Sequence, residues 1–182
     1  MSAIAKKNCG MKLETSRLCL RPYAESDLHD ALAVLGDRET MSFYPQVYSE
    51  EQVAAMIRQS IETHRRHGYG RLAVIEKLSG NFIGDCGLTI QDIAGIAEYE
   101  VGYRIEKSAW GRGYAHEAAA AVVKYGFDVL GLRRLCSYMA SDHHQSRRIA
   151  EKLGMTLEKQ YRNPRNRNYL TCVYAIHRDA TA

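Results

Sequence analysis

Seven segments of the chain show alternating polar and apolar residues or short apolar runs, and this pattern predicts β-strands. A turn signal at residues 77–80 separates two of them, so these two strands are expected to pair as a hairpin. The first strand is expected to stop at Pro22. The predicted strands cover residues 13–22, 69–76, 81–90, 97–105, 134–140, 156–161 and 169–177. A β-sheet is therefore a main part of the predicted fold.

Apolar residues recur at helical spacing in four other segments, residues 27–35, 50–67, 114–130 and 146–153. Ser49 and Gln52 form a capping box at the start of the second helix, and Gly68 follows its end. Gly131 is expected to stop the long alanine-rich helix, and Gly154 to close the last one. These stops give each helix a defined length.

Strand hairpins come first along the chain, and helices alternate with strands later. This order predicts an α/β (α+β) fold in which a mixed sheet carries helices on its faces. The strand, helix and strand between residues 99 and 140 form a crossover, so those two strands are expected to be parallel. Residues 1–10 are expected to form a flexible extension and residues 11–180 a single domain, which suits a chain of 182 residues.

Composition narrows the class of protein. The chain is 46% hydrophobic and 25% charged, which is ordinary for a globular protein, and no apolar run approaches the roughly 20 residues of a membrane span. Without a membrane segment or a secretory signal, a cytoplasmic location without membrane partners is expected. The net charge of +4 suits an anionic cofactor and does not require nucleic acid.

Five cysteines, an odd number with wide spacing, argue against a disulfide framework and a cysteine zinc site. His64 and His67 are expected at the surface end of a helix, where basic side chains suit the helix dipole. No metal site is predicted.

The most informative motif is residues 110–115, Trp-Gly-Arg-Gly-Tyr-Ala, between a predicted strand and a helix start. Glycine allows the backbone to bend and an anion to approach the amides of the first helical turn. Arg112 adds positive charge at the same place. The alternative interpretation is an ordinary tight turn, because a short glycine pattern is weak evidence. The motif has neither the lysine of a Walker loop nor the glycine spacing of a dinucleotide fingerprint.

Four segments in order resemble the GNAT superfamily of acyl-CoA-dependent N-acetyltransferases, and most closely the branch that acetylates N-terminal amines (alanine or serine) of ribosomal proteins. They are residues 13–22, Glu100–Tyr103, residues 110–118 and residues 146–155. The resemblance covers roughly residues 12–178. It implies a mostly antiparallel central sheet of six to seven strands with a V-shaped splay and helices on both faces.

The resemblance implies an enzyme that transfers the acetyl group of acetyl-CoA directly to a primary amine, expected to be a protein N-terminal amine. The alternatives are a small-molecule amine (a polyamine, amino sugar or amino acid) and a catalytically silent CoA-binding regulatory module. The implied CoA-binding residues are Tyr103, Arg104, Ile105, Arg112, Gly113, Tyr114, Ala115, His116, Glu117, His143 and Ser146. A main-chain N–H near Tyr103 or Arg104 is expected to stabilise the oxyanion.

Glu98 and Glu100 are the candidates for the general base, since two residues that lie two apart on a strand share a face. Their alternative role is to hold arginine partners on a solvated strand. Many relatives carry a tyrosine as proton donor where this chain has Ala150, and Ser146 is the expected substitute. Tyr138 and Tyr169 are further candidates between which the sequence does not decide.

Residues 162–168 form a basic, turn-rich loop that the resemblance places at the mouth of the acceptor site. A solvated hairpin loop is the expected role, and contact with RNA phosphates is the alternative. The resemblance also places Tyr44, Tyr48 and Tyr69 near this mouth. A ribosomal surface is an expected partner, and the chain is expected to be a monomer or a homodimer.

Overall fold

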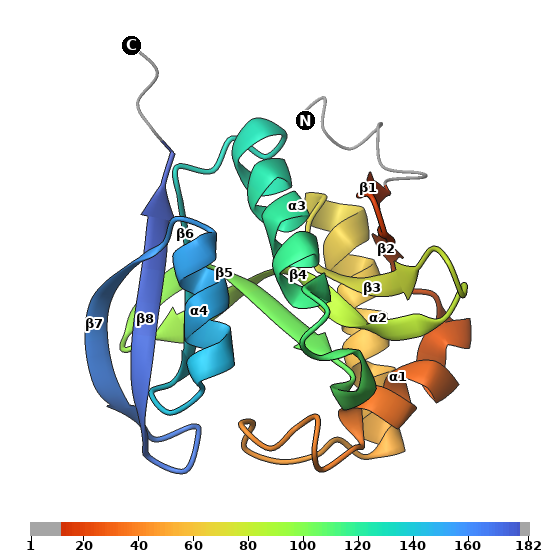
Figure 1. Cartoon of the computed structure of the whole chain (residues 1–182), viewed down its shortest axis with the longest axis horizontal. Coiled ribbons are helices and arrows are strands. Elements are labelled where there is room, and N and C mark those ends of the chain that lie inside the picture. The colour runs from red at the N-terminus through yellow and green to blue at the C-terminus, as the bar shows by residue number, and fades with distance from the viewer. Residues whose placement is uncertain (1–11, 179–182) are drawn as a thin grey trace.

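The fold is one eight-stranded sheet with helices on both faces, seen in a computed structural model that describes residues 12–178 (Figure 1). The strand order is β1-β2-β3-β4-β5-β6-β8-β7. The helices are α1 (Leu28–Leu35), α2 (Glu50–His67), α3 (Tyr114–Asp128) and α4 (His144–Lys152). The strands are β1 (Leu13–Glu14), β2 (Leu18–Pro22), β3 (Arg71–Glu76), β4 (Phe82–Ile93), β5 (Ile96–Ile105), β6 (Arg134–Ala140), β7 (Thr156–Asn163) and β8 (Tyr169–His177).

The fold class predicted from the sequence is confirmed, with one difference in the number of strands. Residues 13–22 form a hairpin of two short strands, because Thr15 closes a turn by bonding to the Leu18 amide and carbonyl. The sheet therefore has eight strands and not six to seven. The predicted extension at residues 1–10 lies outside the described residues.

Alternation along β3 divides the protein into two cores. Leu72 and Val74 belong to a core beneath α3, whereas Ala73 belongs to a core with α1 and α2. Successive strand side chains point to opposite faces, so one strand supplies both cores. Figure 1 shows α3 and α4 in front of the sheet and α2 behind β3 and β4.

The predicted caps of α2 are confirmed, whereas α3 ends at Asp128 with Val129 as its C-cap, before the predicted stop at Gly131. The Ser49 hydroxyl accepts a bond from the Gln52 amide, and the Gln52 side chain accepts one from the Ser49 amide, at 2.9 Å. Gly68 adopts φ +75° directly after α2, and its amide donates to the His64 carbonyl. These contacts satisfy groups that the helix itself leaves without partners.

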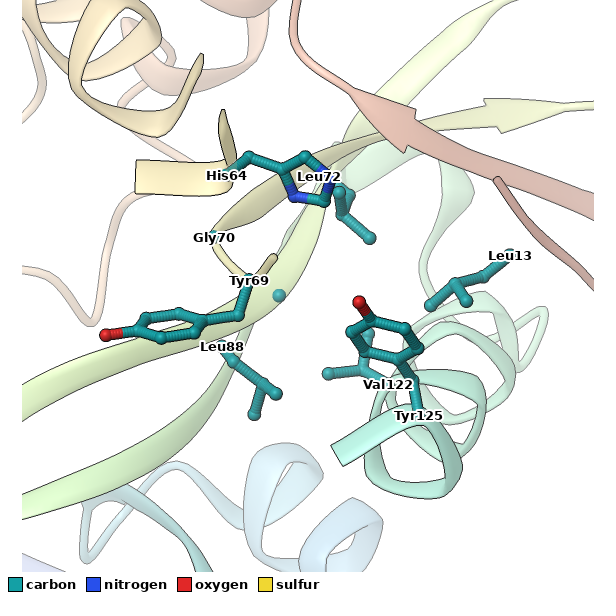
Figure 2. A pocket seen from close by; sticks show the side chains of 9 residues that line it. Leu13, His64, Tyr69, Gly70, Leu72, Leu88, Val122 and Tyr125 are labelled. Atoms are coloured by element: carbon teal, nitrogen blue, oxygen red, sulfur yellow. The ribbon is translucent and has the colours of Figure 1, made fainter. Parts of the chain in front are cut away.

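His64 is buried, so the prediction that it lies at the surface is wrong, whereas His67 is exposed. The His64 imidazole lines a small pocket with Tyr69, Leu72 and Tyr125 (Figure 2). Neither ring nitrogen has a hydrogen-bond partner among the described residues, and burial lowers the pKa of this histidine.

The sheet splits where β5 meets β6. These two strands run parallel, as predicted, but they are paired only at Glu100 and Cys136. Beyond that pair, β5 continues to Ile105 and β6 continues to Ala140, but the two strands do not pair with each other. This divergence produces the predicted V-shaped splay. Among residues 12–178 there is no helix with the length and apolarity of a membrane span.

Candidate functional site

A cavity of about 670 Å³ lies at the split between β5 and β6. It is bordered by both strands, the N-terminal ends of α3 and α4, the segment before α2, and the loop between β7 and β8. Ten of the thirteen predicted site residues line it: Glu100, Tyr103, Arg104, Ile105, Gly113, Tyr114, Ala115, His116, His143 and Ser146. Glu98, Arg112 and Glu117 lie outside the lining.

The start of α3 offers main-chain donors to this cavity. Gly113 is the N-cap with φ +83°, a left-handed conformation that glycine adopts without strain, and no side chain caps the helix. The Glu117 amide donates to the Gly113 carbonyl at 3.1 Å, so intrahelical bonding begins there. The amides of Tyr114, Ala115 and His116 precede it and have no partner within residues 12–178. Such an end favours an anion.

Glu117 and Arg112 have structural partners instead. The Glu117 carboxylate accepts bonds from Thr15 Oγ1 at 2.6 Å, the Arg17 amide at 2.9 Å and the Arg17 guanidinium at 2.7 Å. Burial opposes the shift, but these donors lower the pKa of Glu117 to about 2. Arg112 donates to Glu76 at 3.0 Å. Both predicted side chains therefore fix the start of α3 from outside the cavity.

The register of β5 shows which main-chain groups face the gap. Residue pairs of an antiparallel ladder alternate between bonded and non-bonded. The Glu106 amide donates to the Ile83 carbonyl. Arg104 lies two residues earlier, opposite Asp85, so its main-chain amide and carbonyl also face β4. The intervening Tyr103 and Ile105 face the gap, where their carbonyls accept the Tyr44 hydroxyl at 3.0 Å and the Trp110 indole at 2.7 Å. Of the two amides predicted to stabilise the oxyanion, the Tyr103 amide therefore faces the gap, whereas the Arg104 amide faces β4.

Tyr103 and Ser146 connect the two sides of the split. The Tyr103 hydroxyl lies 2.8 Å from Ser146 Oγ and also donates to the Ser146 carbonyl at 3.1 Å. Burial raises the pKa of Tyr103 well above its ordinary value, so the phenol keeps its proton at neutral pH. Ala150, one turn later on α4, is fully buried and carries no hydroxyl.

A group of buried charges lies on the face of the sheet opposite α3. Asp85 is fully buried and bonds to the Arg104 guanidinium, to Arg71 Nη1 at 3.1 Å and to the Tyr23 hydroxyl at 3.0 Å. Burial raises the pKa of Asp85, but Arg104 and Arg71 outweigh it, and the pKa is lowered. Asp85 is therefore a fixed anion between two arginines.

Glu100 lies beside this group at the pairing point of the two strands. Its carboxylate accepts a bond from Thr89 Oγ1 at 2.9 Å and lies 3.8 Å from Arg71 Nη2. Burial raises the pKa of Glu100, while Arg71 and Thr89 act in the opposite direction. Glu98 lies two residues away, pairs with Arg134 at 3.1 Å and does not line the cavity. The geometry therefore separates two carboxylates that the sequence left equivalent.

One segment, Ser42–Tyr44, crosses the cavity and is called the bridge segment below. The Phe43 ring stacks on His143 with centroids 3.8 Å apart, and the Phe43 carbonyl accepts Asn166 Nδ2 at 3.1 Å. Arg167 donates to the carbonyls of Ser42 at 3.1 Å and Tyr44 at 2.8 Å. Burial lowers the pKa of His143 to about 4, so this ring is neutral at pH 7. The bridge segment thus closes one side of the cavity.

The basic loop borders the cavity, as expected, but two of its arginines have partners within the chain. Arg165 pairs with Asp92 at 2.9 Å, and Arg167 holds the bridge segment. Of the tyrosines placed at the mouth, Tyr44 and Tyr48 line the cavity, whereas Tyr69 lies in the small pocket of Figure 2. Tyr138 lines the cavity and Tyr169 does not.

Sequence reasoning missed Arg71 and Asp85. Both are charged residues inside apolar strands, and this pattern is a signal that would have found them. Among residues 12–178 there is no group of three or more histidine, cysteine, aspartate or glutamate side chains arranged to hold a metal ion.

Comparison with known proteins gives consistent results. Residues 17–156 match the model of the acetyltransferase (GNAT) domain. The chain is 30% identical over 173 residues to the uncharacterized N-acetyltransferase YoaA of Bacillus subtilis, which covers 90% of this chain and 95% of the relative. A crystal structure of an acetyltransferase from Agrobacterium tumefaciens is 27% identical with a TM-score of 0.78, covering 93% and 95% of the two chains.

A ribosomal L7/L12 α-N-protein acetyltransferase in complex with coenzyme A also has this fold. It is 20% identical with a TM-score of 0.77, over 94% of this chain and all of that one.

Proposed function

This chain belongs to the acetyltransferase (GNAT) family, and on that basis we propose that it transfers the acetyl group of acetyl-CoA directly to the α-amine of a protein N-terminus. That it is an acyltransferase acting on an amine follows from the family. One observation carries the finer proposal: Glu100 and the unpartnered amides of α3 open onto the same cavity.

The chain's own groups fit a CoA thioester. The amides of Tyr114, Ala115 and His116 would hold the diphosphate, and the Ile105 amide, on the open edge of β5, would donate to a pantetheine carbonyl. When bound, acetyl-CoA supplies an acetyl group activated as a thioester. The Tyr103 amide is then a donor for the carbonyl oxygen that becomes negative during transfer.

Glu100 is proposed as the general base. An α-amine has a pKa of about 8 and must lose a proton before it attacks, whereas a lysine amine has a pKa of about 10.4 and is harder to deprotonate. A positioned base contributes roughly 10²- to 10⁴-fold. Glu100 is buried at the cavity wall, and its raised pKa makes it a better proton acceptor than an ordinary carboxylate.

Ser146 and Tyr103 are proposed to return a proton to the departing thiolate. Their hydroxyls are 2.8 Å apart, so Tyr103 orients the Ser146 hydroxyl that donates to the thiolate, and the proton that Ser146 gives up is replaced from solvent. The CoA thiolate is a good leaving group, so this assistance is worth less than the base.

A protein N-terminus is proposed as the acceptor because structures with this fold include the L7/L12 α-N-protein enzyme. The bridge segment closes one side of the cavity and favours an acceptor of small cross-section. A small-molecule amine is the second candidate for that reason. A ribosomal partner, a cytoplasmic location and a monomer or homodimer stay predictions.

Calorimetry with acetyl-CoA tests the assigned site. Gly113→Trp places a large side chain at a φ of +83° beside the α3 amides and is expected to abolish binding. The matched control is Gly131→Trp, at the opposite end of α3, where φ is +68° and a Cβ meets nothing within 4 Å. The control is expected to bind like the wild type. Equal binding by both variants, or none by the wild type, would count against the site.

A further inference from the structure

Arg71 reaches the cavity along a row without side chains. In the register of the sheet, Arg71 lies opposite Gly87, and Gly87 lies opposite Gly102. Neither glycine has a side chain to block the arginine, so its guanidinium extends from β3 across β4 to β5. A Cβ on Gly102 would lie 2.8 Å from Glu100 Oε1 and closer still to Arg71 Nη2. Gly102 therefore leaves the space in which these two charged groups meet.

Arg71 has hydrogen-bonding capacity that its protein partners do not use. A guanidinium has five N–H donors in a fixed fork. One donates to Asp85 at 3.1 Å, while Glu100 at 3.8 Å is an ion-pair partner beyond hydrogen-bond distance. Asp85 is also held by Arg104 and Tyr23, so it does not depend on Arg71 alone. The Arg71 side chain is 14% exposed and lines the cavity.

We infer that Arg71 binds the carbonyl or carboxylate oxygen of the acceptor, and that the enzyme therefore selects amines whose neighbouring carbon carries such a group. This inference rests on the proposed function and names its substrate class: α-amino acyl compounds, either a peptide N-terminus or a free amino acid. Glu100 faces the amine and Arg71 faces the acyl oxygen, so this adjacent pair complements the two polar ends of that unit.

The surroundings of the pair support this assignment. Polyamines have no oxygen beside the amine, and amino sugars offer only hydroxyl oxygens there, which are weaker acceptors for a guanidinium than an acyl or carboxylate oxygen. Arg104 also lines the cavity near Glu100, but two of its donors are bound to Asp85. The ionisable groups around Glu100 are Arg71, Asp85, Arg104, Tyr44, Tyr103, Tyr138, Cys86 and Cys136.

The test compares acceptors that differ only in the acyl group. L-Alaninamide and Ala-Ala-Ala represent a peptide N-terminus, L-alanine represents a free amino acid, and isopropylamine replaces the acyl group with a methyl. Values of kcat/KM are expressed per neutral amine, because alkylamines and α-amines differ in pKa. The wild type is expected to prefer alaninamide to isopropylamine by about 10- to 100-fold, as for a hydrogen bond to a charged group.

Arg71→Gln is expected to reduce this preference to near unity, and Arg71→Lys to retain part of it. The ratio of the two acceptors is the readout, so partial loss of folded enzyme does not affect it. Arg134→Gln is the matched control, because Arg134 pairs with Glu98 outside the cavity, and it should keep the wild-type ratio. Preference for L-alanine over the peptide would identify a free amino acid, and not a peptide N-terminus, as the acceptor that Arg71 selects.

Two results overturn the inference while the proposed function stands. One is equal wild-type turnover of isopropylamine and alaninamide, and the other is an unchanged ratio in Arg71→Gln. Wild-type enzyme that transfers acetyl groups to none of these amines would refute the inference and the proposed function together.

Discussion

Glu100 shows how the position of one residue decides its chemistry. Its carboxylate is buried where β5 pairs with β6, but it keeps Thr89 and Arg71 within reach. Burial alone would favour the protonated form, and Arg71 restores part of the stability of the anion. A carboxylate between these influences accepts a proton more readily than an ordinary carboxylate.

Glu100→Gln is expected to lower acetyl transfer by roughly 10²- to 10⁴-fold at pH 7, because the acceptor then has no base. The base acts in its ionised form, so wild-type activity falls as the pH falls through the raised pKa of Glu100. The variant lacks the decrease in activity that protonation of Glu100 causes. The deficit should shrink above pH 9, where an α-amine is already neutral. Rates between pH 5 and 10 measure both effects.

Glu98→Gln provides the matched control for Glu100→Gln. Glu98 shares the face and strand of Glu100 but pairs with Arg134. The rate of Glu98→Gln is expected to stay within about threefold of the wild type, because Glu98 lies outside the cavity and Arg134 keeps Glu158 as a partner. A larger loss in Glu98→Gln than in Glu100→Gln would exchange their roles.

The sequence could place both glutamates on one strand face but could not choose between them. The choice depends on β6, which supplies Arg134 opposite Glu98 and turns away after Cys136 opposite Glu100. No local pattern encodes the point at which two strands diverge. Arg71 was missed for a related reason, since its access to the cavity depends on glycines in two other strands.

The elements themselves were predictable where their signals are local. The capping box predicted the start of α2, and the glycine motif that ends at Gly113, the N-cap, predicted the start of α3. The hairpin at residues 13–22 was not predictable, because its turn is held by Glu117, about a hundred residues later in the chain. The bridge segment has no regular structure, and its position is set by Arg167 and His143.

Arg167→Ala tests whether the bridge segment excludes water. Without the two bonds to the carbonyls of Ser42 and Tyr44, the bridge is expected to open more often. Water would then compete with the amine for the thioester. Thiol release without an acceptor should rise by about fivefold relative to transfer, which corresponds to roughly 1 kcal/mol of lost contact.

Arg162→Ala is the matched control for the bridge. Arg162 belongs to the same basic region, is exposed and has no side-chain hydrogen bond or ion pair within residues 12–178. It should hydrolyse acetyl-CoA at the wild-type rate. Equal hydrolysis by both variants would show that Arg167 does not control water entry, and reduced nucleic-acid binding by both would revive the RNA alternative.

The whole molecule consists of two sheet arms that one strand pair connects. Strands β1 to β5 form one arm with α1, α2 and α3, and β6, β8 and β7 form the other with α4. The arms share the core beneath α3, and the pairing of Glu100 with Cys136 and the contact of Tyr103 with Ser146 are among their further connections. A ligand that contacts α3, β5 and α4 at once therefore adds connections between the arms.

Acetyl-CoA is expected to raise the thermal stability of the whole fold for this reason. A ligand at 100 times its Kd stabilises the folded state by about 2.7 kcal/mol. For a chain of this size that free energy corresponds to a rise in Tm of about 5 to 11 °C. Differential scanning calorimetry measures this rise, and Gly113→Trp should show no rise.

The number of unfolding transitions tests whether the ligand joins the arms. If the wild type binds acetyl-CoA by calorimetry but its arms unfold in two separate transitions, the ligand does not join them. A single transition at higher temperature is the expected result, because a ligand held by both arms is released as soon as one of them unfolds, and this couples their unfolding.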